Sequence, residues 1–192
     1  MSNGLTSIDR NKNPILNIIK NHLSIADSVL EIGSGTGEHI SFFASNIEGI
    51  HWQPSDLSIS GININDLKNV STPVQLDMLN QNWSANIKDH YNIILTINSL
   101  HIMPWQGVVN FWNGCKVLKK LEKVIIYGPF KVNGNFKSES DIAFEKWLKS
   151  NSILSGLRDI SAINDLAKQS GFYLSKNYDM PANNHLLVFI KD

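Results

Sequence analysis

Glycines at alternate positions give this sequence its clearest chemical signal. Gly33, Gly35 and Gly37 follow an apolar run that is typical of a buried strand, and a helix-like segment comes after them. An acid, Glu31, stands two residues before the first glycine. The full run is Val29-Leu30-Glu31-Ile32-Gly33-Ser34-Gly35-Thr36-Gly37. Because glycine allows positive φ and lets a ligand approach bare backbone, the run predicts a ligand-binding loop.

The spacing of the glycines and the charge beside them indicate the kind of ligand. A dinucleotide site usually has the spacing G-x-G-x-x-G and holds a diphosphate at the helix N-terminus, whereas the spacing here is G-x-G-x-G. Glu31 would repel a diphosphate but attract an ammonium or sulfonium group, and S-adenosylmethionine carries both. No Walker lysine follows the loop. A tight glycine turn, with Glu31 in a helix cap or salt bridge, is the alternative interpretation. We predict an S-adenosylmethionine site, with S-adenosylhomocysteine as the product form, built on Glu31, Gly33, Ser34, Gly35 and Gly37.

A sheet has to position this loop, and the chain alternates short β-like runs with helix-like segments. The run over 91–97 is apolar almost throughout, as strands are when helices cover both faces of a sheet. Two final strands with a short connection predict an antiparallel pair. We therefore expect a Rossmann-like, doubly wound α/β fold with a seven-stranded mixed sheet and an antiparallel C-terminal hairpin. The expected strands are 28–32, 49–53, 74–76, 91–97, 123–127, 173–178 and 185–191, and the expected helices are 14–23, 38–46, 58–67, 104–118, 138–150 and 161–170.

The length and patterning predict a single domain over 1–192. The chain has 192 residues, no internal repeat and no long linker. We expect an N-terminal cap helix within 1–27, with Pro14 in its first turn and Arg10 and Asn11 preceding it. Gly128 and Pro129 are expected to end the fifth strand. The looser segment 130–160 is expected to be an insertion that covers the substrate side.

Composition excludes several classes of function. Lys plus Arg and Asp plus Glu both total 17, which argues against a large basic field for nucleic acid but leaves room for a local basic patch. Cys115 is the only cysteine, which excludes an internal disulfide, and the sequence contains no Cys/His zinc cluster. No apolar run is long enough to span a bilayer, and 1–12 lacks a signal-peptide core. We expect a cytoplasmic protein without a bound metal, membrane or nucleic-acid partner.

Several further motifs, together with the glycine loop, resemble one small protein family. The family is the domain-of-unknown-function 938 family, whose animal members are called methyltransferase-like proteins, within the class I S-adenosylmethionine-dependent methyltransferases. The resemblance covers nearly the whole chain and implies the class I fold and cofactor, but no particular methyl acceptor. The motifs are Arg10-Asn11 before Pro14-Ile15-Leu16, the glycine loop, Trp52-Gln53-Pro54-Ser55-Asp56, His101-Ile102 with Pro104-Trp105, Tyr127-Gly128-Pro129-Phe130, and Met180-Pro181-Ala182-Asn183-Asn184.

Polar residues after the next strands are candidates for the rest of the cofactor site. Asp56 can accept hydrogen bonds from both ribose hydroxyls, a role that the resemblance assigns to it, or can cap a helix. The resemblance places Asp77 at the adenine amino group and Met78 on the ring, although Asp77 also suits a plain turn. Asn98 and Ser99 can contact the methionine part of the cofactor or cap the strand end.

The reaction itself requires alignment more than a strong base. Methyl transfer is an in-line displacement, and positioning supplies much of its acceleration. His101 is the candidate general base because imidazole changes charge near neutral pH, but it can equally orient a loop or substrate. We predict His101, Tyr127 and Asn98 at the reacting atoms.

Other residues are predicted around the cofactor and the acceptor. Arg10 and Asn11 precede the helix that commonly covers the cofactor in this fold class, and Arg10 can pair with a carboxylate or with a surface acid. Trp105 and Phe130 are candidate pocket walls or core residues, since an aromatic face attracts a methyl sulfonium. The resemblance favours Asn183 and Asn184 as substrate-binding amides over ordinary turn residues.

The sequence therefore predicts a methyltransferase acting on a small-molecule acceptor. No Asn/Asp-Pro-Pro-aromatic motif follows the fourth strand, which argues against amino-methylation of adenine or glutamine by the usual route. The main competing hypothesis is a non-catalytic S-adenosylmethionine-binding sensor or scaffold. Two enzyme classes also compete with it: an NAD-dependent oxidoreductase, which Glu31 and the glycine spacing disfavour, and an aminopropyl transferase using the decarboxylated cofactor.

Overall fold

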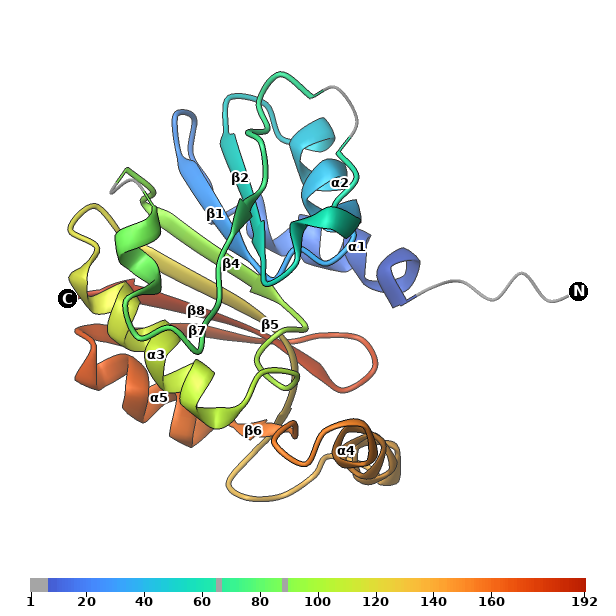
Figure 1. The fold of residues 1–192 in the computed structure, drawn as a ribbon. Coiled ribbons are helices and arrows are strands. Elements are labelled where there is room, and N and C mark those ends of the chain that lie inside the picture. Colours follow the sequence, from blue (N-terminus) through green and yellow to red (C-terminus); the bar gives the residue numbers. More distant parts are fainter. Residues whose placement is uncertain (1–6, 65–66, 88–89) are drawn as a thin grey trace, which may run out of the picture.

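The structure is a three-layer α/β sandwich in which helices cover both faces of one twisted sheet (Figure 1). It is a computed structural model that describes residues 7–64, 67–87 and 90–192. Seven strands run in the order β3-β2-β1-β4-β5-β8-β7, and a short strand, β6, pairs with β5 outside this path. The strands are β1 Ser28–Ile32, β2 His51–Asp56, β3 Val74–Gln75, β4 Ile93–Ile97, β5 Lys123–Lys131, β6 Arg158–Asp159, β7 Phe172–Asp179 and β8 Asn184–Lys191.

The strand pairing confirms the predicted mixed, doubly wound sheet. β1 pairs in parallel with both β2 and β4, while β8 pairs antiparallel with β5 and β7. The strand order reverses between β1 and β4, so the carboxyl ends of these two strands border the crevice where such sheets bind ligands. The helices are α1 Ser7–Ile19, α2 Glu38–Asn46, α3 Trp105–Val117, α4 Glu139–Asn151 and α5 Ile160–Gln169, with 3-10 turns η1 Ile59–Gly61 and η2 Trp83–Asn86.

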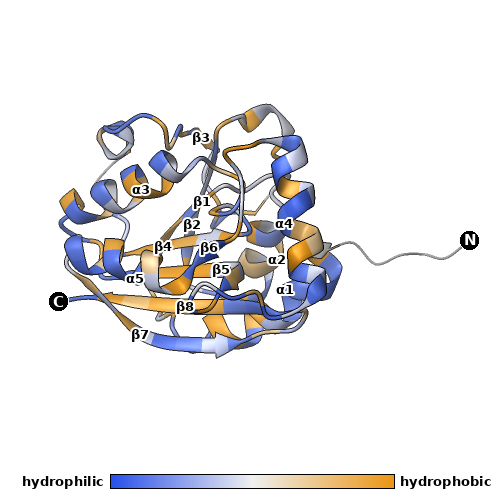
Figure 2. Cartoon of the chain, turned by 90° about the horizontal axis from the view of Figure 1, so that it is seen from below, coloured by the Kyte–Doolittle hydropathy of each residue, from blue (hydrophilic) through white to orange (hydrophobic). Residues whose placement is uncertain are grey.

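The two faces of the sheet bury separate apolar clusters. Along β5, Val124 and Ile126 belong to the cluster under α3 and α5, whereas Ile125 belongs to the cluster under α1 and α2. This alternation follows from the two-residue period of a strand, and it explains why the central strands read as continuous apolar runs. The hydropathy colours in Figure 2 show apolar central strands and polar outward helix faces. Cys115 lies in the first cluster, and burial raises the pKa of its thiol.

The first helix differs from its prediction. α1 begins at Ser7, so Pro14 lies inside it instead of in its first turn, and Arg10 and Asn11 are helical residues that do not precede it. A proline inside a helix removes one backbone hydrogen bond and costs about 3 kcal/mol. Packing offsets that cost because Asn11, Ile15 and Ile19 are buried at helical spacing on both sides of the proline.

The fifth strand also runs further than predicted. Gly128 and Pro129 continue β5 to Lys131, pairing with His185 and Asn184 of β8. The parallel partner β4 ends opposite Tyr127, so on that side Pro129 has no strand to which an N–H would donate. The proline is tolerated for that reason.

Two other predicted elements need correction. The second strand is His51–Asp56, later than the predicted 49–53, so Asp56 ends the strand itself. A helix over 58–67 is not formed across its described part, which contains only the η1 turn; residues 65 and 66 lie outside the described residues. Gly61 and the β-branched side chains disfavour a longer helix there. No helix within the described ranges is long and apolar enough to cross a membrane.

Candidate functional site

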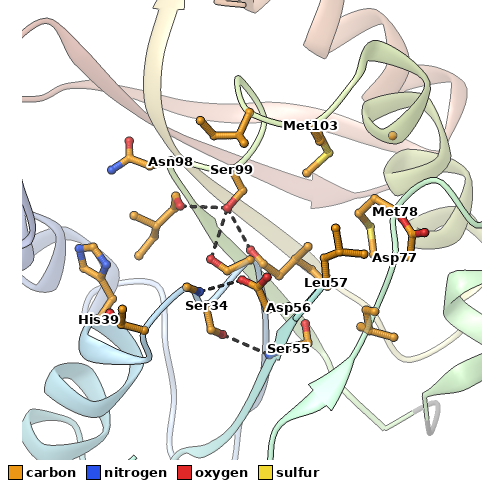
Figure 3. Close-up of a pocket in the computed structure, with 18 of the residues that line it drawn as sticks. Ser34, His39, Ser55, Asp56, Leu57, Asp77, Met78, Asn98, Ser99 and Met103 are labelled. Atoms are coloured by element: carbon orange, nitrogen blue, oxygen red, sulfur yellow. Dashed lines mark hydrogen bonds between the residues drawn. The ribbon is translucent and has the colours of Figure 1, made fainter. Parts of the chain in front are cut away.

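The carboxyl ends of β1, β2 and β4 surround a pocket of about 530 Å³. Figure 3 shows His39 and Asn98 on one side of this pocket, Asp77 and Met78 on the other, and Asp56 between them. The first pocket is therefore elongated across the glycine loop. The predicted cofactor residues that line it are Gly33, Ser34, Gly35, Asp56, Asp77, Met78 and Asn98.

The glycine loop is held by short hydrogen bonds from the neighbouring strand. The backbone N–H groups of Gly33 and Ser34 both donate to the Ser55 carbonyl at 2.9 Å, and Gly35 N–H donates to Asp56 Oδ2 at 2.8 Å. All three glycines of the loop have positive φ, between 59° and 83°. These bonds fix the loop against β2, which leaves little room for it to rearrange.

The glycines serve different purposes. A Cβ at Gly33 would lie 2.2 Å from Ser99 Oγ, whereas a Cβ at Gly35 would meet no atom within 4 Å. The absence of a side chain at Gly33 therefore lets the loop pack on Ser99, and Gly35 leaves open space at the pocket. Gly37 is the N-cap of α2 and does not line the pocket.

Glu31 lies behind the loop within β1 and does not itself line the pocket. Its side chain is buried, and Oε2 has no hydrogen-bond partner among the described residues. Burial raises the pKa of Glu31 to about 7; the charge of Asp56 raises it further, and a hydrogen bond from Ser34 opposes both effects. A buried carboxylate oxygen without a donor has an unmet need for a positive or hydrogen-bonding group. This observation fits a cationic ligand at the loop.

The two aspartates of the pocket each hold local structure and also face the cavity. Asp56 uses Oδ2 for Gly35 N–H, and its Oδ1 accepts from Ser58 N–H at 3.3 Å. Asp77 is exposed, and its Oδ1 accepts from Leu79 N–H at 2.8 Å in a turn. Met78 beside it is buried. The alternative turn role of Asp77 is thus present in the structure, and its second oxygen is left for a ligand.

A second pocket of about 720 Å³ adjoins the first, because Asn98 and Ile102 line both. Asn98 has a φ of 55°, and its N–H donates to the Tyr127 carbonyl at 2.8 Å. This left-handed turn points the chain away from the sheet between the two pockets. The predicted residues that line the second pocket are Arg10, Asn11, Asn98, His101, Tyr127 and Asn184.

Two buried residues of the second pocket, His101 and Tyr127, are neutral near pH 7. Burial, aided by the charge of Arg158, lowers the pKa of His101 to about 4. Burial raises the pKa of Tyr127, although a hydrogen bond with Asn11 opposes this. Asn11 Oδ1 also lies 2.8 Å from Nε2 of His39, which lines the first pocket. A hydrogen-bonded chain thus joins the pockets, and the low pKa of His101 favours an orienting role over that of a base.

The family of the chain follows from its whole length. A family model described as "Protein of unknown function (DUF938)" matches residues 4–191. The chain belongs to the DUF938 family.

Solved structures with the same fold include several methyltransferases. The methyltransferase CalO1 of calicheamicin biosynthesis, in an SAH-bound form, matches with a TM-score of 0.73 and 13% identity over 95% of this chain and 54% of that one. An O-methyltransferase family protein from Burkholderia thailandensis matches with a TM-score of 0.78 and 13% identity, over 97% of this chain and 57% of that one. Magnesium protoporphyrin IX methyltransferase from Synechocystis PCC 6803, with bound SAH, matches with a TM-score of 0.68 and 11% identity, over 95% of this chain and 82% of that one. The DUF938 chain has the class I methyltransferase fold and spans little more than half the length of the first two.

Three predicted substrate residues of the DUF938 chain lie outside both pocket linings. Trp105 is partly exposed, and the Arg158 guanidinium lies 5.8 Å from its ring centroid. Phe130 is buried in the cluster under α3 and α5. The Asn183 amide donates to Ser138 Oγ at 2.8 Å, which ties the hairpin turn to the start of α4. These positions support core, surface and turn roles for the three residues.

Sequence reasoning missed several lining residues. His39 lies in the first turn of α2, two residues after Gly37, where a polar side chain faces back toward the loop. His39 could have been predicted from the sequence, because it is a polar residue at the start of an otherwise apolar helix. The α4 residues of the second pocket carried no motif and are Ser140, Asp141, Phe144 and Trp147.

A short segment braces the loop that carries His101 and Ile102. Every carbonyl from Leu100 to Met103 accepts a hydrogen bond from the segment 155–158. Arg158 contributes two of them, from Nε to Leu100 O at 3.1 Å and from Nη2 to Met103 O at 2.6 Å. Within the described part of the chain, no group of three or more His, Cys, Asp or Glu residues is arranged to hold a metal ion.

We expect Arg158→Lys to loosen this brace without unfolding the protein. Lysine keeps the charge but cannot place two donors in a fixed fork, so about 1 to 2 kcal/mol of stability should be lost. Hydrogen exchange should rise at the amides of 100–103, and chemical denaturation should measure the loss. Lys146→Arg, on the exposed face of α4, is the control. Unchanged exchange over 100–103 would contradict the assigned role of Arg158.

Proposed function

We propose that this DUF938 chain is an S-adenosylmethionine-dependent methyltransferase acting on a small-molecule acceptor. The observation that carries the proposal is the buried, unpartnered carboxylate oxygen of Glu31 behind a bare glycine loop at the strand switch point. A cation is the ligand that best satisfies such a group. The SAH-bound forms of CalO1 and magnesium protoporphyrin IX methyltransferase support the same cofactor class.

The two ends of the first pocket suit different parts of the cofactor. Asp77 and Met78 at one end offer a hydrogen-bond acceptor and an apolar surface, which suit an adenine amino group and ring. Asp56 lies between the ends, where a carboxylate suits ribose hydroxyls. His39 and Asn98, at the other end, are polar groups suited to an amino-acid portion. These roles deepen the predicted cofactor site and add His39 to it.

The second pocket is the proposed acceptor chamber. S-adenosylmethionine, when bound, supplies an electrophilic methyl group. Asn98 lines both pockets, so an acceptor atom held beside it adjoins the cofactor pocket. His101 and Tyr127 orient this atom, and the wall of α4 excludes water from it. Because its pKa is lowered to about 4, His101 is a weak base, so an acceptor that is already nucleophilic near pH 7 is favoured.

Calorimetric titration tests the proposal. S-adenosylmethionine and S-adenosylhomocysteine should each bind with one site per chain and should raise the melting temperature, whereas NADH should do neither. Binding of NADH instead of both sulfur compounds would overturn the proposal. Tight cofactor binding without S-adenosylhomocysteine formation, across broad acceptor panels, would favour the non-catalytic sensor instead.

A further inference from the structure

The second pocket has one wall built from a single helix face. Ser140, Phe144 and Trp147 of α4 lie at helical spacings of four and three, which place them on the same side of the helix. The rings of Phe144 and Trp147 are nearly parallel, with centroids 5.7 Å apart and an interplanar angle of 13°. Phe144 also meets His101 edge-on at 5.4 Å. Aromatic surface therefore continues from the pocket mouth to its polar depth.

Trp147 is unusually exposed for a tryptophan of this protein. Its relative exposure is 57% and that of Trp105 is 41%, whereas Trp52, Trp83 and Trp112 are fully buried. A large ring that stays in water forgoes most of the burial that tryptophan normally contributes, and exposed aromatic surface at a cavity is typical of a binding site. Because Trp147 lines the second pocket, a ligand there would cover it.

The depth of the pocket is polar but carries little net charge. His101 and Tyr127 are buried, so they lie deeper than Trp147, and Asn98 marks the junction with the first pocket. Among the described lining residues, the formally charged ones are Arg10 and Asp141, which have opposite signs. The Asp141 oxygens accept from Lys137 N–H at 3.1 Å and Asn183 Nδ2 at 3.4 Å, which anchors the start of α4. The described lining of this pocket therefore does not present a strong electrostatic field of one sign to a ligand.

We propose that the second pocket binds a flat aromatic small molecule. Its ring stacks on Trp147 and Phe144, and a polar substituent points toward Asn98, His101 and Tyr127. The binding site for the ring is inferred from the geometry of α4 alone. The further statement that the polar substituent is the methyl acceptor rests on the function proposed above. A saturated ring of equal size lacks the flat π-face that parallel side-chain rings favour.

A matched pair of probes tests this inference without knowledge of the natural acceptor. The probes are 1-naphthol and decahydro-1-naphthol, which share a carbon skeleton and one hydroxyl group. Saturation-transfer NMR and fluorescence titration measure binding to the full chain, with and without saturating S-adenosylhomocysteine. We expect 1-naphthol to bind about ten-fold more tightly than its saturated partner.

The variants locate the site of that preference. Trp147→Leu should reduce the preference by about three- to ten-fold, and Phe144→Leu should reduce it less. Tyr173→Leu, which removes an exposed ring from β7 at a distance from both pockets, should leave it unchanged. Equal affinity for the two probes, or a preference that Trp147→Leu does not change, would overturn the inference. Failure of S-adenosylhomocysteine to bind would instead count against the proposed function, and the probe comparison would still decide this one.

Discussion

Glu31→Gln should weaken S-adenosylmethionine binding by about ten- to a hundred-fold near pH 8, while leaving the fold intact. The variant keeps the shape of the side chain and removes its charge, and a buried charge a few ångströms behind the loop should act on a cation in the pocket by about 1 to 3 kcal/mol. The pKa of Glu31 is about 7, so the wild-type carboxyl is ionised at that pH and protonated well below it. The affinity difference should therefore shrink toward about pH 5.5, where both side chains are neutral. Titration calorimetry at the two pH values measures it.

The same variant should change stability in the opposite direction. Burial raises the pKa of Glu31 from 4.5 to about 7, so the folded protein holds this proton more tightly than the unfolded chain does. That stabilisation is complete below pH 4.5 and is lost as the pH rises through 7. Glu31→Gln should consequently be more stable than wild type near pH 8, by at most about 3 kcal/mol in denaturant unfolding. An equal loss of affinity at both pH values, or lower stability near pH 8, would contradict the electrostatic role of Glu31.

Local patterns predicted the sheet well because each central strand has a distinct local signature. Both faces of β4 are covered by helices, so its five residues are all buried and the run is apolar without interruption. The second helix was predicted with its observed bounds, because the glycine at its N-cap separates it from β1. Gly171, directly after the C-cap of α5, has a φ of 81°, the left-handed conformation that ends helices and that glycine adopts readily. Signals of this kind depend only on neighbours in the sequence.

The errors in the fold arose where distant residues decide the outcome. Pro14 favours a helix start on local grounds, but the burial of Asn11 and Ile15 against the rest of the protein extends α1 beyond it. Pro129 reads as a strand end, yet β4 has already ended beside it and β8 still pairs with it. In both cases a tertiary contact overrides a preference that the sequence shows correctly.

The cofactor side of the site was more predictable than the acceptor side. Gly33, Gly35 and Asp56 lie at or just after strand ends, and the topology of the sheet brings strand ends together. The wall of the second pocket comes from α4, far along the chain from these residues, and nothing in its spacing distinguishes a pocket face from an outward face. Phe144 and Trp147 were accordingly missed, whereas Phe130, which follows a conspicuous strand, was proposed in their place and is buried in the core.

The two glycines of the loop should respond differently to the same substitution, although both have positive φ. The left-handed backbone costs an alanine about 1 kcal/mol at either position. At Gly33 the new methyl group would also collide with Ser99 Oγ, which adds roughly 1 to 3 kcal/mol of overpacking. At Gly35 it would meet only open space at the pocket, so Gly35→Ala should stay folded but bind S-adenosylmethionine at least about ten-fold more weakly.

Denaturant unfolding and calorimetric titration of both variants separate the two effects, and a double variant identifies the collision. Adding Ser99→Gly to Gly33→Ala should restore the overpacking part of the lost stability, because it removes both atoms nearest the new Cβ. Equal destabilisation at Gly33 and Gly35 would show that the left-handed backbone alone explains the loop. Unchanged affinity in Gly35→Ala would mean that no ligand approaches this stretch of backbone, and the placement of the cofactor along the loop would then be wrong. Comparison of the two variants therefore shows whether each glycine is required for the stability of the fold or for ligand binding.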